Sequence, residues 1–193
     1  MSGAAPAATP AYERNEFITA PLRFAGVFSA GECARIMELG LAKPMYRGGI
    51  VQPREDYRRT SVTWLDRTDD LDWLFAKLDD LVLRINDWYR FDIIPAANDL
   101  QFAEYEAGDT IGWHIDCGGE RGPPRKISMS IQLTHPREYD GGALEFVTMG
   151  ELPMSRIQGT VVAFPSFLCH RVAPVTRGKR HSLVVWVAGQ AFR

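Results

Sequence analysis

The chain has few cysteines, few histidines and no long apolar run. It contains three cysteines, Cys33, Cys117 and Cys169, among 193 residues. An odd number without framework spacing argues against a disulfide scaffold and favours a reducing, cytoplasmic environment. No apolar stretch approaches the length of a transmembrane helix, which argues against a helical membrane protein. The formal net charge of −2 argues against general binding to nucleic acid or to an anionic membrane.

The rest of the composition is that of an ordinary globular protein. Hydrophobic residues make up 46% of the chain and aromatic residues 11%. A chain of this length forms one domain with a sizeable core. Residues 1–14 begin with an Ala/Pro-rich stretch that lacks the basic and apolar regions of a signal peptide. We therefore expect a disordered tail over residues 1–14 and a single domain over residues 15–193.

The first half of that domain predicts helices, over about residues 28–90. Ser29 and Glu32 have the spacing of a capping box, which marks the start of a first helix. A longer helix, from about Thr68 to Tyr89, follows from apolar residues at steps of three and four. Its acidic first turn is favoured by the helix dipole.

From residue 99 onward the pattern changes to short strands separated by Gly/Pro turns. The last expected strand is apolar on both faces, so the long helix is expected to cover its outer side. These features predict a mainly β fold, a double-stranded β-helix (jelly roll) over about residues 99–190, with the helices packed on one sheet. The expected strands are Leu100–Tyr105, Ile111–Asp116, Lys126–Thr134, Gly142–Phe146, Gly159–Phe164 and Ser182–Ala188.

Two of the four histidines belong to a pattern with metal-binding chemistry. In a β-strand, His114 and Asp116 would point to the same side, about 6.5 Å apart. His170, from a remote strand, would supply a third ligand. Two histidines and one carboxylate are the donors of the facial triad that binds Fe(II) and leaves positions open for substrate and oxygen. A His-x-Asp triplet also occurs in many proteins without a metal, so the interpretation depends on the sequence after His170.

Arg180 gives independent support for an anion site. Strand alternation places Arg180 and Trp186 on one face. If that face lines the interior, the guanidinium requires an anion, and its planar fork matches a carboxylate. The alternative is a solvated basic turn formed with Arg177 and Lys179. Lys179 is the second candidate for an anion ligand, but it lies on the opposite face from Trp186.

The segment from His170 to Trp186 resembles the Fe(II)/2-oxoglutarate-dependent dioxygenases, most closely their prolyl 4-hydroxylase-like branch. In that family a Gly and then a basic residue, ten positions after the last metal His, precede a Trp six positions further on. Two upstream segments match as well, Tyr105–Gly108 as Tyr-x-x-Gly and Gly141–Phe146 as Gly-Gly-x-Leu-x-Phe. The resemblance extends over roughly residues 100–190.

The resemblance implies a dioxygenase domain over residues 15–193, with Fe(II), 2-oxoglutarate and O2 as cofactors and ascorbate as an optional addition. Many relatives have a Tyr where this chain has Gln132, whose amide can donate the same hydrogen bond. For Tyr105, a core role with a satisfied hydroxyl is the alternative. The implied ligands are His114, Asp116 and His170 for the metal, and Arg180, Tyr105, Gln132 and Trp186 for 2-oxoglutarate.

The implied reaction is hydroxylation of an unactivated C–H bond, with 2-oxoglutarate converted to succinate. Related halogenases lack the carboxylate that Asp116 supplies, so its presence argues for hydroxylation. The leading substrate is a prolyl residue in a peptide or protein, and a free amino acid or another small metabolite is the alternative. A non-catalytic metal-binding or sensor domain is the third hypothesis. Arg180 argues against it, because such a module has no use for a buried anion ligand.

Two Gly-containing loops are candidates for contact with the substrate. One runs from Tyr46 to Arg59 and the other over residues 118–124. A plain surface loop is the alternative for each of them. The expected contact residues are Tyr46, Tyr57, Arg58, Arg59 and Arg121.

Overall fold

The structure is a computed structural model that describes residues 18–47, 58–95, 99–117, 123–147 and 156–191. Within these residues, thirteen strands and two α-helices follow one another along a mainly β chain, as the sequence predicts. In chain order the elements are β1 (Leu22–Phe24), α1 (Ala30–Leu41), β2 (Tyr46–Arg47), β3 (Arg58–Arg59), β4 (Ser61–Trp64), the 3-10 turn η1 (Asp69–Leu71), α2 (Asp72–Tyr89), β5 (Asp99–Tyr105), β6 (Thr110–His114), β7 (Arg125–Gln132), β8 (Tyr139–Gly141), β9 (Leu144–Phe146), β10 (Val161–Pro165), β11 (His170–Val172), β12 (Val175–Gly178) and β13 (Arg180–Ala188).

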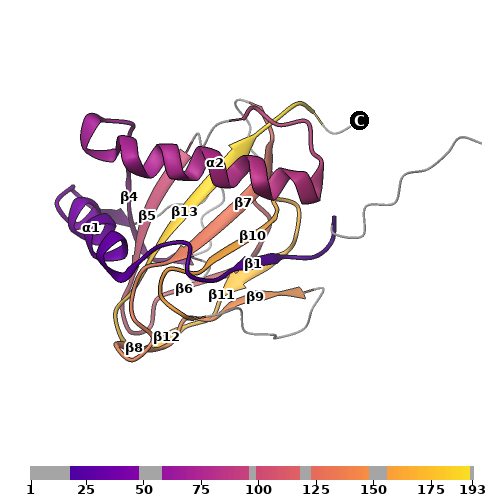
Figure 1. Cartoon of the computed structure of the whole chain (residues 1–193). Helices are drawn as coiled ribbons and strands as arrows, with labels where there is room; N and C mark the ends of the chain where they lie inside the picture. The colour runs from indigo at the N-terminus through magenta and orange to yellow at the C-terminus, as the bar shows by residue number, and fades with distance from the viewer. Residues whose placement is uncertain (1–17, 48–57, 96–98, 118–122, 148–155, 192–193) are drawn as a thin grey trace, which may run out of the picture.

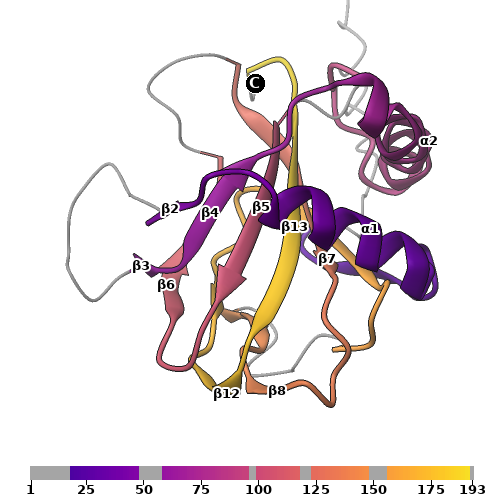
Figure 2. The same cartoon turned by 90° about the vertical axis from the view of Figure 1, so that its left-hand side faces the viewer.

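Two antiparallel sheets form the core of the fold. The large sheet has seven strands in the order β1-β10-β7-β13-β5-β4-β2, and the small sheet has four in the order β3-β6-β11-β9. Strands β12 and β8 form a separate pair. Figure 1 shows α2 lying across the large sheet, and Figure 2 shows both helices on one side of that sheet with β6 on the other. The predicted jelly roll with helices on one sheet is confirmed.

Each face of the large sheet has its own apolar cluster. The helix-facing cluster joins α1 and α2 to the sheet through residues such as Ile36, Leu78, Phe102 and Leu183. The inter-sheet cluster fills the space between the two sheets and includes Tyr105, Phe146 and Phe164. Because side chains alternate along β13, those of its odd-numbered residues point toward the helices and those of its even-numbered residues point into the space between the sheets.

The helices begin and end largely as their sequences predict. Ser29 and Glu32 form both bonds of the capping box at the start of α1, which confirms that prediction. The longer helix begins with one 3-10 turn, because Thr68 provides no side-chain cap for the first amides. It ends where Arg90 takes a left-handed conformation, with φ of 54°. Within the described residues, neither helix combines the length and apolar content needed to cross a membrane.

Several strand boundaries differ from the prediction. Residues 46–47 and 58–59, expected in a loop, are the short edge strands β2 and β3, and β4 follows them as an unpredicted strand. The strand expected over Gly142–Phe146 starts at Leu144, because Gly141 and Gly142 have φ of 74° and 62°. The strand expected to reach Asp116 ends at His114. Residues 48–57 and 118–122 lie outside the described residues.

Candidate metal centre and anion cavity

Strand pairing brings His114 and His170 together. His114 is the last residue of β6 and His170 the first of β11, and the two are direct cross-strand partners in the small sheet. Their ring centroids lie 4.1 Å apart. Phe164 from the large sheet packs edge-on against His170 at 4.6 Å, which fixes that ring from the other side. Residues remote in sequence thus become neighbours at one end of the jelly roll.

Asp116 reaches the same point from a bend that follows β6. The expected reason, alternation within one strand, is wrong, because the strand has already ended. The backbone N–H of Asp116 donates to the Ser166 carbonyl at 2.8 Å and holds the bend in place. The Ser128 hydroxyl donates to Oδ2 of Asp116 at 2.8 Å. The two carboxylate oxygens then lie 3.5 Å from Nε2 of His114 and 3.6 Å from Nε2 of His170.

The hydrogen bonds of both imidazoles orient them as metal ligands. Nδ1 of His114 lies 2.9 Å from the carbonyl oxygen of Gly112, and Nδ1 of His170 lies 2.9 Å from that of Leu168. A carbonyl oxygen only accepts, so each Nδ1 carries the proton and each Nε2 presents its lone pair toward Asp116. The ligand atoms of all three residues lie within 4.8 Å of one another. Two imidazole nitrogens and one carboxylate on one side of a site match the donors of Fe(II).

The protonation states at this cluster also suit a metal. Burial alone would raise the pKa of the Asp116 carboxyl, but the neighbouring imidazoles of His114 and His170 outweigh it and keep that pKa well below its usual range. Trp186 lies beside this carboxylate, and its buried indole N–H has no hydrogen-bond partner within the described structure. Burial lowers the pKa of His170 and outweighs the attraction of Asp116. The site therefore offers a carboxylate and a neutral imidazole near pH 7, as metal ligation requires.

Arg180 lies buried between the two sheets, 3% exposed. It is paired across the large sheet with Tyr105, and its neighbour on the same face, Ser182, is paired with Gln132. Nε of Arg180 donates to Oε1 of Gln132 at 3.1 Å, and the guanidinium lies 5.1 Å from the centre of the Tyr105 ring. Among the described residues, these partners and Ser182 are all neutral. The buried positive charge therefore lacks a carboxylate, as an anion site requires.

The expected 2-oxoglutarate ligands divide between two places. Tyr105 and Gln132 accompany Arg180, whereas Trp186 lies at the other end of β13, across from Ser128 and close to Asp116. Lys179, the second candidate, is about half exposed and its Nζ lies 2.7 Å from Oε1 of Glu106. That ion pair raises the pKa of Lys179 and satisfies its charge at the surface.

The expected substrate contacts are only partly within the described residues. Tyr46 is exposed on β2, and Arg59 is exposed on β3. Arg58 points inward, where NH2 donates to Oε1 of Gln101 at 2.7 Å. Tyr57 and Arg121 lie outside the described residues. The structure thus places Arg58 near the space between the sheets and leaves the other contacts as predictions.

A cavity opens beside Arg180. Its lining comes from both sheets and from the segment that leads into β10. Gly142, with φ of 62°, leaves room for the arginine, since a Cβ added there would lie 2.8 Å from Cδ of Arg180. The lining residues are Ser130, Gln132, Gly142, Leu144, Arg156, Thr160, Val162 and Arg180.

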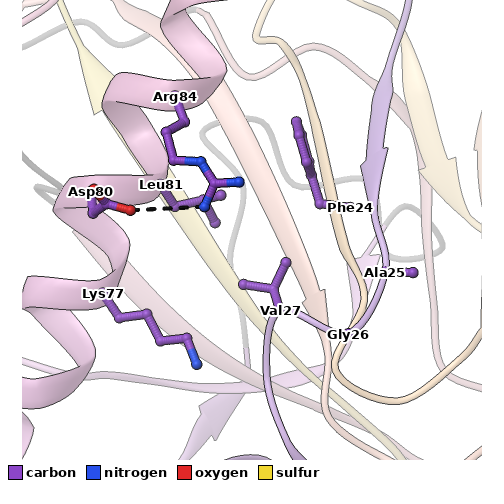
Figure 3. Close-up of a pocket in the computed structure, with 8 residues that line it drawn as sticks. All are labelled: Phe24, Ala25, Gly26, Val27, Lys77, Asp80, Leu81 and Arg84. Atoms are coloured by element: carbon purple, nitrogen blue, oxygen red, sulfur yellow. Dashed lines mark ion pairs between the residues drawn. The ribbon is translucent and has the colours of Figure 1, made fainter.

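A second hollow lies on the far side of the large sheet, between α2 and the end of β1 (Figure 3). Arg84 pairs with Asp80 at 3.9 Å, and Nζ of Lys77 lies 2.6 Å from Oε1 of Glu32. The cations of this hollow therefore have acidic partners already, unlike Arg180.

Sequence reasoning missed several residues of the site. The alternation of Ser128, Ser130 and Gln132 predicts one polar strand face, but it does not say that this face meets a metal cluster at one end and a cavity at the other. Ser166 shares a hydrogen bond of 2.9 Å with Ser128 and completes the support of Asp116. Arg156 has no motif or periodicity that would mark it, since it precedes β10 in an irregular segment.

Comparison with known proteins shows a family to which the part of the chain that carries this geometry is similar. Residues 100–188 match the model of the 2OG-Fe(II) oxygenase superfamily. A PKHD-type hydroxylase of Synechococcus sp. is 33% identical over 103 residues, which cover 50% of this chain and 45% of that protein. Another, of Gloeothece citriformis, is 36% identical over 46% of this chain and 41% of its own length. The chain thus spans less than half the length of these curated relatives.

Solved structures extend the likeness over most of the chain. A prolyl-4-hydroxylase of Pseudomonas putida is 27% identical with a TM-score of 0.69, over 88% of this chain and 93% of its own. A prolyl hydroxylase of Trichoplax adhaerens shares the fold, with a TM-score of 0.72 at 16% identity over 89% of this chain and 84% of its own. The cofactors of the matched superfamily are Fe(II), 2-oxoglutarate and O2, as the resemblance implies. In its matched segment, its fold and its triad of potential metal ligands, the chain is similar to the 2OG-Fe(II) oxygenase superfamily and, among solved structures, to prolyl 4-hydroxylases.

Proposed function

We propose that this protein is an Fe(II)- and 2-oxoglutarate-dependent dioxygenase that hydroxylates prolyl residues in a peptide or protein. The observation that carries the proposal is the cluster of His114, Asp116 and His170, in which both Nε2 lone pairs and one carboxylate converge. The 27% identity to a bacterial prolyl-4-hydroxylase over most of the chain supports the prolyl substrate. The dioxygenase domain is proposed to cover residues 15–193.

Bound Fe(II) would supply the oxidation, in which O2 places one oxygen in the C–H bond and the other in succinate as 2-oxoglutarate loses CO2. His114, Asp116 and His170 would hold the ion on one face and leave the opposite positions open. Asp116 fills the third protein position, which favours hydroxylation over halide transfer. Ser128 keeps its carboxylate oriented through the 2.8 Å hydrogen bond.

Arg180 would bind the distal carboxylate of 2-oxoglutarate. Its Nε donates to Gln132, one face of its guanidinium lies against the Tyr105 ring, and NH1 makes only a 3.5 Å contact with Ser182, so the terminal nitrogens can donate to a ligand in the cavity. Because Arg180 is only 3% exposed, an ion pair with a bound carboxylate would be shielded from solvent and would gain strength. Trp186, which lies close to Asp116, would border the bound cosubstrate on the side of the metal. A module that only senses metal has no evident use for this buried guanidinium.

The test combines the purified protein with Fe(II), 2-oxoglutarate, O2 and a library of proline-containing peptides. We expect succinate to form and some peptides to gain about 16 Da on proline, the one-oxygen increment of this chemistry. Free L-proline should be a poor substrate, because it lacks the remote contacts that help to position the reacting carbon. If free amino acids drive succinate formation and every peptide fails, the small-metabolite hydroxylase is the correct function.

A further inference from the structure

A second arginine faces the cavity beside Arg180. Arg156 lies in the segment before β10 and lines the same cavity. Its NH2 donates to the carbonyl oxygen of Tyr139, and its guanidinium stacks over the Tyr139 ring at 4.3 Å. These contacts fix the position of Arg156 without neutralising it. Two positive charges thus converge on one small space between the sheets.

Among the described residues, no acidic side chain balances either charge. Within the described part of the chain, no ion pair joins Arg156 or Arg180 to a carboxylate, although most other arginines near acids form such pairs, for instance Arg171 with Glu145 at 2.6 Å. Nε of Arg156 is buried without a hydrogen-bond acceptor. A buried donor on a charged group carries a large desolvation penalty unless something accepts from it. The cavity therefore has more donor capacity than its own side chains use.

The neutral groups around the cavity indicate the same kind of ligand. Thr160 lines the cavity, is 1% exposed, and its hydroxyl has no hydrogen-bond partner within the described structure. The hydroxyl of Tyr139, the residue under Arg156, is also buried without a partner. Hydroxyls and guanidinium nitrogens can all donate to one anion. A carboxylate, with about four lone-pair sites, can accept from several of them at once.

We propose that Arg156 is a second binding residue for the distal carboxylate of the cosubstrate, which it would share with Arg180 and the Thr160 hydroxyl. The inference rests on the proposed function, since it names how the same cosubstrate is recognised. Two guanidiniums around one carboxylate make the cavity selective for a 2-oxo acid with an anionic far end. A 2-oxo acid with an uncharged far end leaves both arginines unpaired and binds weakly.

The experiment compares two ligands that differ only at that end. The binding of 2-oxoglutarate and of 2-oxovalerate, which lacks the distal carboxylate, is measured by calorimetry on the full-length protein without turnover. Arg156→Gln should weaken 2-oxoglutarate binding by roughly tenfold to a hundredfold, the range for loss of charge-assisted hydrogen bonds. The affinity for 2-oxovalerate should stay within about twofold, because that ligand presents nothing to the arginine. Arg156→Lys should recover part of the loss.

Arg35→Gln is the matched control, because Arg35 is an exposed arginine paired with Glu38 on α1. It should bind both ligands as the unchanged protein does, and melting temperatures should show that all variants are folded. Equal weakening of both ligands by Arg156→Gln would mean that Arg156 only supports the fold around Tyr139, and unchanged 2-oxoglutarate binding would also overturn the proposal. If the unchanged protein binds no 2-oxoglutarate, the proposed function itself fails. The two failures are therefore distinguishable.

Discussion

The two faces of the large sheet differ in how the polar side chains of the same strands are satisfied. On the helix-facing side, Leu183 and Val185 of β13 are fully buried in an apolar cluster, and His181 among them finds Thr134 and Glu104 as hydrogen-bond partners. On the side facing the small sheet, Arg180 is buried and has no carboxylate partner among the described residues. Adjacent residues of one strand thus differ in whether the protein satisfies them. Polar groups satisfied by the protein support the fold, and groups left unsatisfied indicate where a ligand belongs.

Among substitutions on the face between the two sheets, loss of a metal ligand should reduce activity the most. His170→Ala removes one of the three converging ligands, so Fe(II)-dependent succinate formation should fall to background while the helix-facing cluster keeps the protein folded. The measurements are succinate yield and thermal melting. His135→Ala is the control, because His135 is exposed and outside the cluster. Full turnover by His170→Ala would show that the triad does not hold the metal.

Loss of the anion ligand should give the next effect. Arg180→Ala removes a buried charge that the cosubstrate would pair, which should weaken 2-oxoglutarate by about 2–5 kcal/mol, as for truncations of buried charge pairs. The Michaelis constant for 2-oxoglutarate should rise far more than the dissociation constant for the metal. Lys179→Ala should change little, because its charge is already paired with Glu106 at the surface. An equal effect of both variants would contradict the assignment.

A substitution on the helix-facing side should separate stability from function. Leu183→Ala leaves a cavity in a cluster that is fully buried, and the free energy of unfolding should fall by about 2–5 kcal/mol. The folded protein should keep its affinity for 2-oxoglutarate, measured below the unfolding transition. Leu83→Ala is the control, because Leu83 is exposed on α2, and its unfolding free energy should change little. A shift in cosubstrate affinity for Leu183→Ala would mean that the two faces are not independent.

The smallest expected effect is a pH dependence on the helix-facing side. Burial raises the pKa of the Cys33 thiol from 9.0 to about 11. The folded state therefore favours the neutral thiol, so the stabilisation is complete below pH 9 and is lost as the pH rises toward 11, a change of about 2–3 kcal/mol. Denaturant unfolding at pH 8.5 and pH 11 measures the loss. Cys33→Ala should lose less stability over this interval, and equal losses would contradict the role of the thiol.

Local signals in the sequence predicted the helices well. The capping box at Ser29 and the apolar repeat ending at Tyr89 depend on neighbours within a few residues, so they can be read without knowing the fold. The short strands β2, β3 and β4 could not be read in this way. Strands β2 and β3 have two residues each and β4 has four, too few to show a clear alternation, and all three form because remote strands such as β6 and β5 pair with them.

In the candidate site, too, some features could be predicted from the sequence and others depend on contacts with remote residues. His114, Asp116 and His170 were predicted from their donor chemistry together with a family resemblance, and Arg180 from strand alternation together with the same resemblance. The physical reason given for Asp116 was wrong, since its position depends on the Ser166 carbonyl and not on strand alternation. Arg156 lay outside every pattern, because its approach to the cavity depends on how the chain turns before β10.

The pairing of His114 with His170 has a mechanical consequence. The two residues begin and end a long stretch of chain, yet they are opposite each other across a single pair of strands. An ion held between them would act as a cross-link and would close that stretch into a loop, as a disulfide does in an oxidising environment. Its removal would loosen the pairing of β6 with β11, so the small sheet would be more rigid with the metal bound than without it.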